Sequence, residues 1–565
     1  MRIARGMGTS VLAAAAVAAA LLAADGRVTG QSGHGDHGAS GTKPAVPIDG
    51  LSSHRHPIKT GNSLTQQFFD QGLNFCFAFN HEEAARAFRR AAQLDPEAPM
   101  PLWGLAYSLG PNFNMPRDLA RDKEAFEAVR KAVPLAAGGT EHERDYVAAM
   151  ARRYSDDAEA DPKDLDEAFR DAMRDLAQRY PDDLDAATIY AESIMDLRPW
   201  KLWSSDGRPS PGTKELIAVL ESVLKRDPSH PGANHYYIHA VEASPSPEKA
   251  LAAAHRLEGL APAAGHLVHM PGHIYLLTGD YAGAARVNVR AAEADRALFR
   301  LAGKQGMYPI MYYTHNLHFI MAASAMQGRE AEAVQHARLV EIEIRAVLKR
   351  DPLPQDFLPM FEAFLPSPLF MDLRFRKWDA VMRLPAPDPR LVVGTALWRA
   401  GRAVARLAQR YPAGAEAEAQ AFRAARAKVS EGAGFGLSQA SDVLDIAGSM
   451  MDAQMLEAKG DTDGALLAWR SAVEAQARLS YNEPPDWFYP VRESLGGALL
   501  RAGRPGEAER VFRDDLERHP RSGRSLFGLW KSLEAQKRDT DAAWVKREFQ
   551  AAWKNATVSL RVEDL

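Results

Sequence analysis

Seven histidines recur at fixed spacing through the middle of the chain. His269 and His273 follow His235 and His239 by 34 positions. Two further histidines, His315 and His318, follow His266 and His269 by 49 positions. Neutral imidazole is a common ligand of zinc and copper, and it also titrates near neutral pH. The spacing therefore predicts transition-metal binding if the fold brings these side chains together. The set is His235, His239, His266, His269, His273, His315 and His318.

Helical periodicity places these histidines on common faces. At about 100° per residue, His266, His269 and His273 lie within about 60° of one another, on the side opposite Val268. Pro271 interrupts this run and should kink a helix unless it lies in the first turn. We therefore expect three histidines on one stripe that faces away from the packing side of the helix.

A second stripe precedes the first. His235 and His239 are separated by one helical turn, and Glu242 falls beside them. Because packed helices lie about 8–10 Å apart, we expect His235 to meet His269 and His239 to meet His273 across neighbouring helices. His269 with His318 would continue the row. Glu242 could complete a metal shell or accept a proton.

The elements that must position these residues are helical hairpins. From Leu64 onward the first unit has Phe68, Gly72 and Phe75, then Ala84, Phe88 and Ala91, then Pro96. These residues and their spacing resemble the tetratricopeptide repeat, whose length is 34 residues. Small residues let the paired helices approach, aromatic residues fill the space between them, and proline ends the second helix.

The resemblance extends over nearly the whole chain and returns in units near 231, 265, 314, 460, 496 and 526. It implies an all-α, right-handed solenoid whose first helices line a concave groove. The histidine stripes would then face that groove. The run from His266 to Tyr275 is also similar to one in exported bacterial repeat proteins of unassigned role, which implies a bacterial envelope setting.

The chain is divided by changes in composition. Residues 1–24 have the charged start and apolar run of a secretory signal peptide, too short for a comfortable membrane span. Residues 25–63 read as a disordered Gly/Ser/His linker. We expect a first repeat array over 64–351, a proline-rich hinge or groove-closing loop over 352–388, a second array over 389–555, and a tail over 556–565.

Charge and cysteine content exclude other classes. The net charge of −4 gives no field that would attract nucleic acid, and no phosphate-binding loop or cysteine zinc motif is present. The only cysteine is Cys76, so intramolecular disulfides are impossible and the thiol should be buried. The prediction is a periplasmic or secreted protein with no stable membrane span after processing.

Three hypotheses for the histidines stay open. The first is a zinc or copper site. The second is a metal-free groove that holds a peptide segment of an envelope protein. The third is a structural network in which imidazoles bond to neighbouring backbone. A metal-dependent hydrolase with Glu242 as base is less favoured, because no second carboxylate lies on the stripe.

An aromatic and proline block near the C-terminus has two interpretations. Residues 482–490 read Asn-Glu-Pro-Pro-Asp-Trp-Phe-Tyr-Pro and come just before a predicted helix. The block could fold over the end of a groove and hold a ligand. It could instead cap the helix and pack on the preceding repeat, which we favour.

Overall fold

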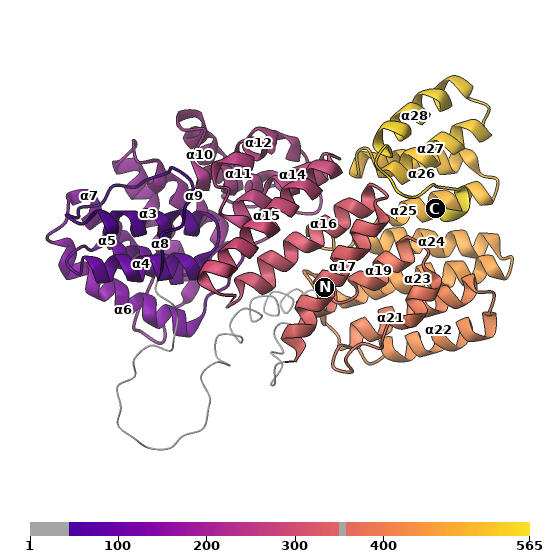
Figure 1. The fold of residues 1–565 in the computed structure, drawn as a ribbon, viewed down its shortest axis with the longest axis horizontal. Coiled ribbons are helices and arrows are strands. Elements are labelled where there is room, and N and C mark those ends of the chain that lie inside the picture. The colour runs from indigo at the N-terminus through magenta and orange to yellow at the C-terminus, as the bar shows by residue number, and fades with distance from the viewer. Residues whose placement is uncertain (1–44, 305, 350–357) are drawn as a thin grey trace, which may run out of the picture. The chain divides into compact units, whose positions relative to one another are not determined.

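A computed structural model describes residues 45–304, 306–349 and 358–565, and Figure 1 shows its helices. The predicted signal peptide and residues 25–44 of the predicted linker lie outside the described residues. Apart from one pair of two-residue strands, β1 (Gly434–Phe435) and β2 (Ser438–Gln439), the regular structure of the described chain is helical. The all-α repeat fold predicted from the sequence is confirmed.

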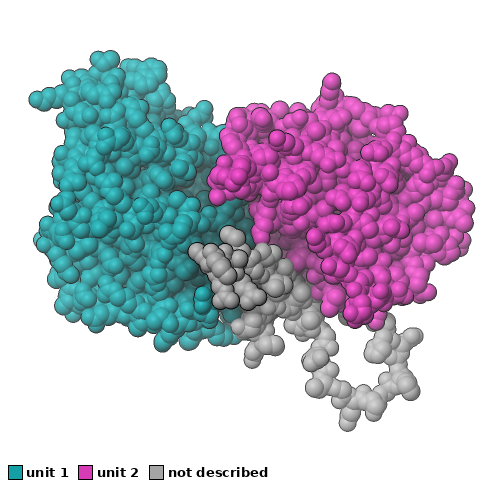
Figure 2. All heavy atoms as spheres, turned by 180° about the vertical axis from the view of Figure 1, so that it is seen from behind, with its two compact units in different colours: residues 1–17, 275–289, 314–565 teal, residues 18–274, 290–313 magenta. Residues whose placement is uncertain are grey.

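The chain folds into two compact units, coloured separately in Figure 2. The described residues 45–274 and 290–313 form what we call the N-terminal unit, and residues 275–289 and 314–565 form the C-terminal unit. The predicted boundary at 352–388 falls inside the C-terminal unit, so the compact units divide the chain differently from the predicted arrays.

The N-terminal unit is built from consecutive antiparallel helices. Its helices are α3 (Ser63–Phe77), α4 (His81–Leu94), α5 (Met100–Leu109), α6 (Leu119–Ala136), α7 (Glu141–Met150), α8 (Pro162–Arg179), α9 (Leu184–Asp196), α10 (Thr213–Arg226), α11 (Pro231–Glu242), η2 (Pro247–Ala250), α12 (Leu251–Leu260), α13 (Gly265–His269) and the π-helical turn η3 (Pro309–Tyr313). The boundary between the units falls within α14 (Pro271–Leu277) and α15 (Tyr281–Ala302).

The C-terminal unit continues the same construction. Its remaining elements are α16 (Thr314–Met326), α17 (Glu330–Leu348), α18 (Leu358–Phe364), α19 (Ser367–Arg374), α20 (Trp378–Arg383), α21 (Val392–Ala408), α22 (Pro412–Arg426), α23 (Ala440–Ala458), α24 (Thr462–Ala477), α25 (Val491–Arg501), α26 (Pro505–Arg518), α27 (Gly523–Ala535), α28 (Asp539–Ala552) and η5 (Val562–Asp564). The predicted hinge or loop over 352–388 is therefore largely helical where it is described, as α18, α19 and α20.

The predicted roles of the small and aromatic residues hold in the first hairpin. A Cβ at Gly72 would lie 2.7 Å from the Phe88 ring, so only glycine lets α3 approach α4 this closely. Phe75, Ala84 and Phe88 are fully buried between the two helices. Cys76 is also fully buried, and burial raises the pKa of its thiol well above the ordinary value. The predicted core role of this cysteine is confirmed.

The N-terminal unit curls back onto its own first hairpin. Alternate helices pack on one another, α3 on α5, α5 on α7, and α9 on α11. In addition α11 packs on α3, where Gly232 approaches the Phe77 ring so closely that a Cβ would lie 2.6 Å from it. This contact places the end of α3 against the side of α11 that carries His235, and it buries that histidine.

Residues 45–62 differ from the prediction of a disordered linker. They form no helix but are fastened to the first hairpins by hydrogen bonds, such as Ile48 N–H to Gln71 Oε1 at 2.9 Å and Lys59 N–H to Glu143 Oε1 at 2.7 Å. His54 Nε2 lies 2.8 Å from Asp185 Oδ1, and His56 Nδ1 lies 2.7 Å from Asp185 Oδ2. Buried polar partners therefore order a segment that has no hydrophobic periodicity.

The pKa values of this contact are strongly shifted. Burial alone would lower the pKa of His54 and His56, but the hydrogen bond and charge of Asp185 outweigh it and raise both. Burial alone would raise the pKa of Asp185, yet hydrogen bonds from His230 and His54 hold it well below the usual range. Charged imidazolium and carboxylate groups therefore hold residues 45–62 against α9.

Within the described residues, no helix is long and apolar enough to cross a bilayer.

We expect Asp185→Asn to destabilise the protein more at pH 5.5 than at pH 8.5. A histidine whose folded pKa is raised contributes stability that is present below pH 6.5 and is lost as pH rises through the folded pKa. The loss in unfolding free energy, measured by urea denaturation, should be larger at pH 5.5 by on the order of 1 kcal/mol. His255→Ala, at an exposed position of α12, is the control. Equal losses of Asp185→Asn at both pH values would contradict the ion-pair description.

Candidate functional site: a buried histidine cluster

Five of the seven predicted histidines gather in the N-terminal unit. His235 and His239 project from α11, His266 and His269 from α13, and His273 from α14. All five side chains are at most 2% exposed. The prediction of imidazoles that line an open groove is therefore wrong, because the curl of α11 onto α3 closes that face. The histidines are nevertheless close neighbours, with ring centroids 4.8 Å apart for His235 and His266.

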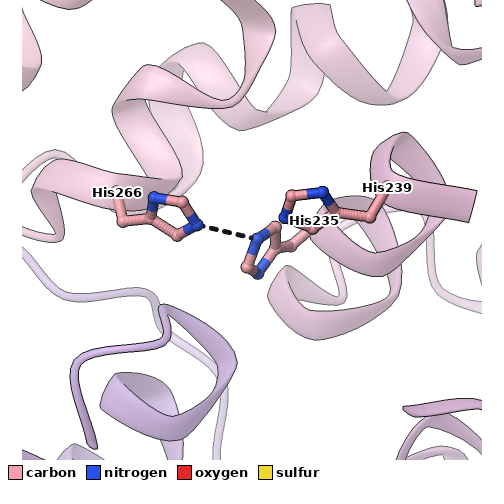
Figure 3. A group of neighbouring side chains, drawn as sticks. All are labelled: His235, His239 and His266. Atoms are coloured by element: carbon pink, nitrogen blue, oxygen red, sulfur yellow. Dashed lines mark hydrogen bonds between the residues drawn. The ribbon is translucent and has the colours of Figure 1, made fainter. Parts of the chain in front are cut away.

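The pairing of the rings also differs from the prediction. His235 Nε2 lies 3.1 Å from His266 Nε2, and Figure 3 shows the two rings facing each other from α11 and α13. His269 Nε2 lies 2.7 Å from His273 Nε2, across the break between α13 and α14. The break at Pro271 was expected, and it lets these two rings turn toward each other. His239 and His273 approach less closely, with centroids 5.9 Å apart.

Hydrogen bonds at Nδ1 fix the tautomers of the two histidines on α11. His235 Nδ1 donates to the carbonyl of Phe77 at 2.6 Å, and His239 Nδ1 donates to Glu242 Oε1 at 2.8 Å. In a neutral imidazole the other nitrogen then carries a lone pair. Each Nε2 atom is therefore an acceptor or a metal ligand, and His239 Nε2 has no hydrogen-bond partner in the described part of the chain.

Glu242 orients two of the imidazoles. Its Oε1 accepts from His239, and its Oε2 lies 2.8 Å from His273 Nδ1. Burial alone would raise the pKa of Glu242, but the neighbouring His273 and His239 lower it. The carboxylate therefore stays ionised at neutral pH. Carboxylates in this position behind a ligating histidine raise its basicity and fix its direction.

Two rings of this cluster, His235 and His266, are neutral. Burial lowers the pKa of His235 well below its ordinary value, and neighbouring His239 adds to the effect. Burial and the proximity of His235 do the same for His266. Both rings are therefore neutral at pH 7. Because His235 Nε2 has no proton, His266 Nε2–H donates in the contact between them. A metal bound at His266 Nε2 would require that proton to lie on Nδ1, which has no hydrogen-bond partner in the described residues.

Three imidazoles form a compact donor set. His235, His239 and His266 each offer a ring nitrogen within 4.8 Å of the other two (Figure 3). A metal ion about 2.0–2.1 Å from each of two nitrogens would hold them roughly 3.3 Å apart at a tetrahedral angle. The observed 3.1 Å between His235 Nε2 and His266 Nε2 is close to that separation.

Aromatic residues enclose this donor set. The Phe79 ring stacks on His239 and His266 at centroid distances of 5.7 and 5.6 Å, and meets His235 edge-on at 4.5 Å. Phe79 lies in the turn between α3 and α4 with φ of 52°, a left-handed conformation that costs a non-glycine residue roughly 1–2 kcal/mol. Tyr312 covers His266 from another side at 4.7 Å. The surroundings of these three rings are therefore largely aromatic.

Two successive hydrogen bonds, through Tyr308 to Asp295, fix the start of α13. The backbone N–H of His266 donates to the Tyr308 hydroxyl at 3.1 Å, and that hydroxyl donates to Asp295 Oδ1 at 2.9 Å. Asp295 lies so close to Gly265 that a Cβ there would clash with it at 1.9 Å. Gly265 is therefore required for the position of His266.

The last two predicted histidines belong to α16 of the C-terminal unit. His318 is half-buried, its ring lies 5.2 Å from that of Phe364, and desolvation lowers its pKa to about 4. His315 contacts the Phe319 ring at 5.0 Å. Their place in a metal site stays a prediction.

Sequence reasoning missed a second group of buried histidines. Asp185 accepts from His54, His56 and His230, and His142 Nε2 lies 2.7 Å from Asp183. His230 is a fully buried N-cap residue of α11. Its Nδ1 accepts the N–H of Ala233 at 3.2 Å, so the proton of the neutral ring lies on Nε2 and points at Asp185. That nitrogen is a donor and cannot ligate a metal without losing the cap, so this group serves structure.

The aromatic block before α25 packs on the preceding repeat, as favoured. Trp487 and Tyr489 are buried, and their carbonyls accept from Gln476 Nε2 of α24 at 3.3 and 2.9 Å.

Comparison with known proteins identifies no family. No protein-family model and no curated protein matches the chain. Among solved structures, a human IFIT1 dimer with m7Gppp-AAAA is similar over 89% of this chain and 92% of its own, at 13% identity and a TM-score of 0.30. The APC/C hetero-tetramer Cut9–Hcn1 is similar over 89% of each chain, at 13% identity and a TM-score of 0.28. Such low scores carry no conclusion about function, so the site must be judged from its own geometry.

We expect Glu242→Ala to lower the unfolding free energy by about 2–4 kcal/mol, because it leaves buried imidazole N–H groups without an acceptor. Glu242→Gln should cost less, since its amide oxygen still accepts from one ring. Urea denaturation at pH 7 with a chelator present measures the effect on the protein alone. Glu248→Gln, at an exposed position in η2, is the matched control. A loss of under about 0.5 kcal/mol for both Glu242 variants would contradict the assigned role.

Proposed function

We propose that the N-terminal unit of this helical-repeat scaffold binds a transition metal ion, zinc or copper, through Nε2 of His235, His239 and His266. One observation carries the proposal. His235 and His239 each commit Nδ1 to an oxygen acceptor and turn a lone-pair nitrogen toward His266 in a buried, aromatic-lined space. A buried nitrogen acceptor such as His239 Nε2 is costly unless something binds to it.

The Nδ1 hydrogen bonds of His235 and His239 favour metal binding over a purely structural network of histidines. Histidine ligands of metals usually donate their other nitrogen to a carboxylate or a backbone carbonyl. Glu242 and the Phe77 carbonyl occupy these two positions.

In a structural network both nitrogens of each ring would be satisfied by the protein itself, as they are for His235, whereas His239 Nε2 and His266 Nδ1 have no partner in the described residues. His269 and His273 lie next to the donor set, and the orientation of His273 depends on the same carboxylate.

Burial favours retention of the ion over catalysis on it. Side chains that are at most 2% exposed leave no route for a substrate of any size. Ion pairs with His239 and His273 lower the pKa of Glu242, which makes this carboxylate a weak base toward a metal-bound water. The same burial weighs against a peptide as the ligand of these histidines. The metal would tie α11 and α13 to the end of α3, where Phe77 lies.

The N-terminal sequence supports export as the setting. Residues 1–24 carry the features of a secretory signal peptide, so we propose that the scaffold acts in the bacterial periplasm or outside the cell.

Protein purified without an affinity tag should contain stoichiometric zinc or copper by elemental analysis, and a chelator should lower its melting temperature. A metal at 100 times its dissociation constant stabilises the native state by about 2.7 kcal/mol. The double variant His235→Ala/His239→Ala should lose the metal, whereas His255→Ala should retain it. Circular dichroism would establish that the double variant is folded. Absence of metal from the wild-type protein, or full metal content in the double variant, would refute the site.

A further inference from the structure

The C-terminal unit contains an apolar hollow that is independent of the metal proposal. Its volume is about 430 Å³, within the range of ligand-binding pockets. Its floor is formed by small and aliphatic side chains of the first helices of two successive hairpins, α21 and α23. The floor residues are Leu397, Ala400, Gly401, Val404, Ala447 and Met451.

One wall of the hollow carries excess positive charge. Apart from the tail, its charged lining residues are four arginines, on or beside α19, α25 and α27, and two glutamates. Glu493 is held by Arg374 at 3.0 Å and by Arg524 at 2.8 Å, and Glu457 by Arg501 at 3.1 Å. Arg376 is the arginine that pairs with neither of these glutamates. Such a wall suits an acidic partner.

The chain's own residues 561–565 occupy one end of this hollow. Arg376 binds the Asp564 carboxylate at 3.0 Å and also donates to the carbonyl of Glu563. Arg524 donates to the carbonyl of Asp564, and Arg501 donates to that of Val562 at 3.3 Å. Arginines therefore hold the backbone carbonyls of this helical turn as well as its acid.

The aliphatic residue at the end of this segment packs against α25. Leu565 is 8% exposed and lies against Gly497 of α25, where a Cβ would approach the Leu565 Cβ to 2.6 Å. Trp487 and Tyr489 also line the hollow. Space remains along α21 and α23 beside the tail, so a longer peptide would bury more apolar surface there than the tail does.

We propose that this hollow is a binding site for a peptide that has an acidic residue next to an aliphatic one. Residues 561–565 of the chain itself occupy the site as an intramolecular competitor. The occupant in trans is a segment of another protein with the chemistry of Val-Glu-Asp-Leu. Because a short tether gives the tail an effective concentration in the millimolar range, a partner must exceed that concentration or fill the remaining floor to displace it.

A fluorescent peptide that copies residues 558–565, with its end amidated, tests the proposal by fluorescence polarisation on the full chain. The tail-release variant Asp564→Lys/Leu565→Asp should bind the peptide at least tenfold more tightly than the wild-type protein. Adding Arg376→Ala and Arg524→Ala to the release variant should remove that gain. A control peptide in which lysine replaces the residue corresponding to Asp564 should not bind. Equal peptide affinity of wild type and release variant would overturn the competitor role.

Hydrogen exchange of the wild-type chain provides a second readout that needs no variant. Excess unlabelled peptide should increase amide exchange in residues 558–565 by displacing the tail, and should leave exchange in α27 unchanged. If the tail stays protected at saturating peptide, or if the release variant loses cooperative unfolding of the C-terminal unit, the segment is a structural part of the fold and the proposal fails.

Discussion

A buried imidazole must find a partner for two ring nitrogens, and this requirement organises the N-terminal unit. The backbone and carboxylate oxygens behind His235 and His239 satisfy one nitrogen of each ring. Burial lowers the pKa of His235 and of His266. Neither ring therefore gains a second proton at neutral pH, and each keeps one nitrogen that must accept a hydrogen bond or bind a metal. Nε2 of His235 and of His239 therefore lies in a buried, aromatic-lined space, where we propose that a transition metal binds.

The same requirement has a different solution at Asp185. There the carboxylate is central, and His54, His56 and His230 surround it with N–H groups. The direction of the proton separates the two clusters. Imidazoles around Asp185 donate toward the carboxylate, whereas His235 and His239 of the candidate site donate outward from Nδ1 and turn Nε2 toward the other rings. Proximity of histidines alone would not have distinguished a metal site from an ion-pair cluster.

Much of the fold could be predicted, because its determinants are local. The spacing of Gly72, Ala84 and Phe88 encodes a hairpin whose helices approach closely, and the structure retains each of these roles. The ordering of residues 45–62 was not predictable, because it depends on Asp185, which lies more than a hundred positions later. A segment without hydrophobic periodicity gives no sign of such a partner.

The histidine positions were predictable as stripes, but their environment was not. Helical spacing correctly places His235 and His239 together, and it flags Pro271 as a break. The contact of α11 with α3 is a long-range consequence of the curl of the unit. It converts a predicted open groove into a closed space and brings Phe77 and Phe79 to the imidazoles. It also changes the ring pairs, so that His235 meets His266 and not His269.

The most direct measurement is anomalous diffraction at the zinc and copper absorption edges, from a crystal of the untagged protein grown without chelator. A single strong peak within about 2.0–2.1 Å of Nε2 of His235, His239 and His266 is the predicted result. The contradicting result is no anomalous peak among these rings, with His239 Nε2 bonded to a water molecule or to another protein group.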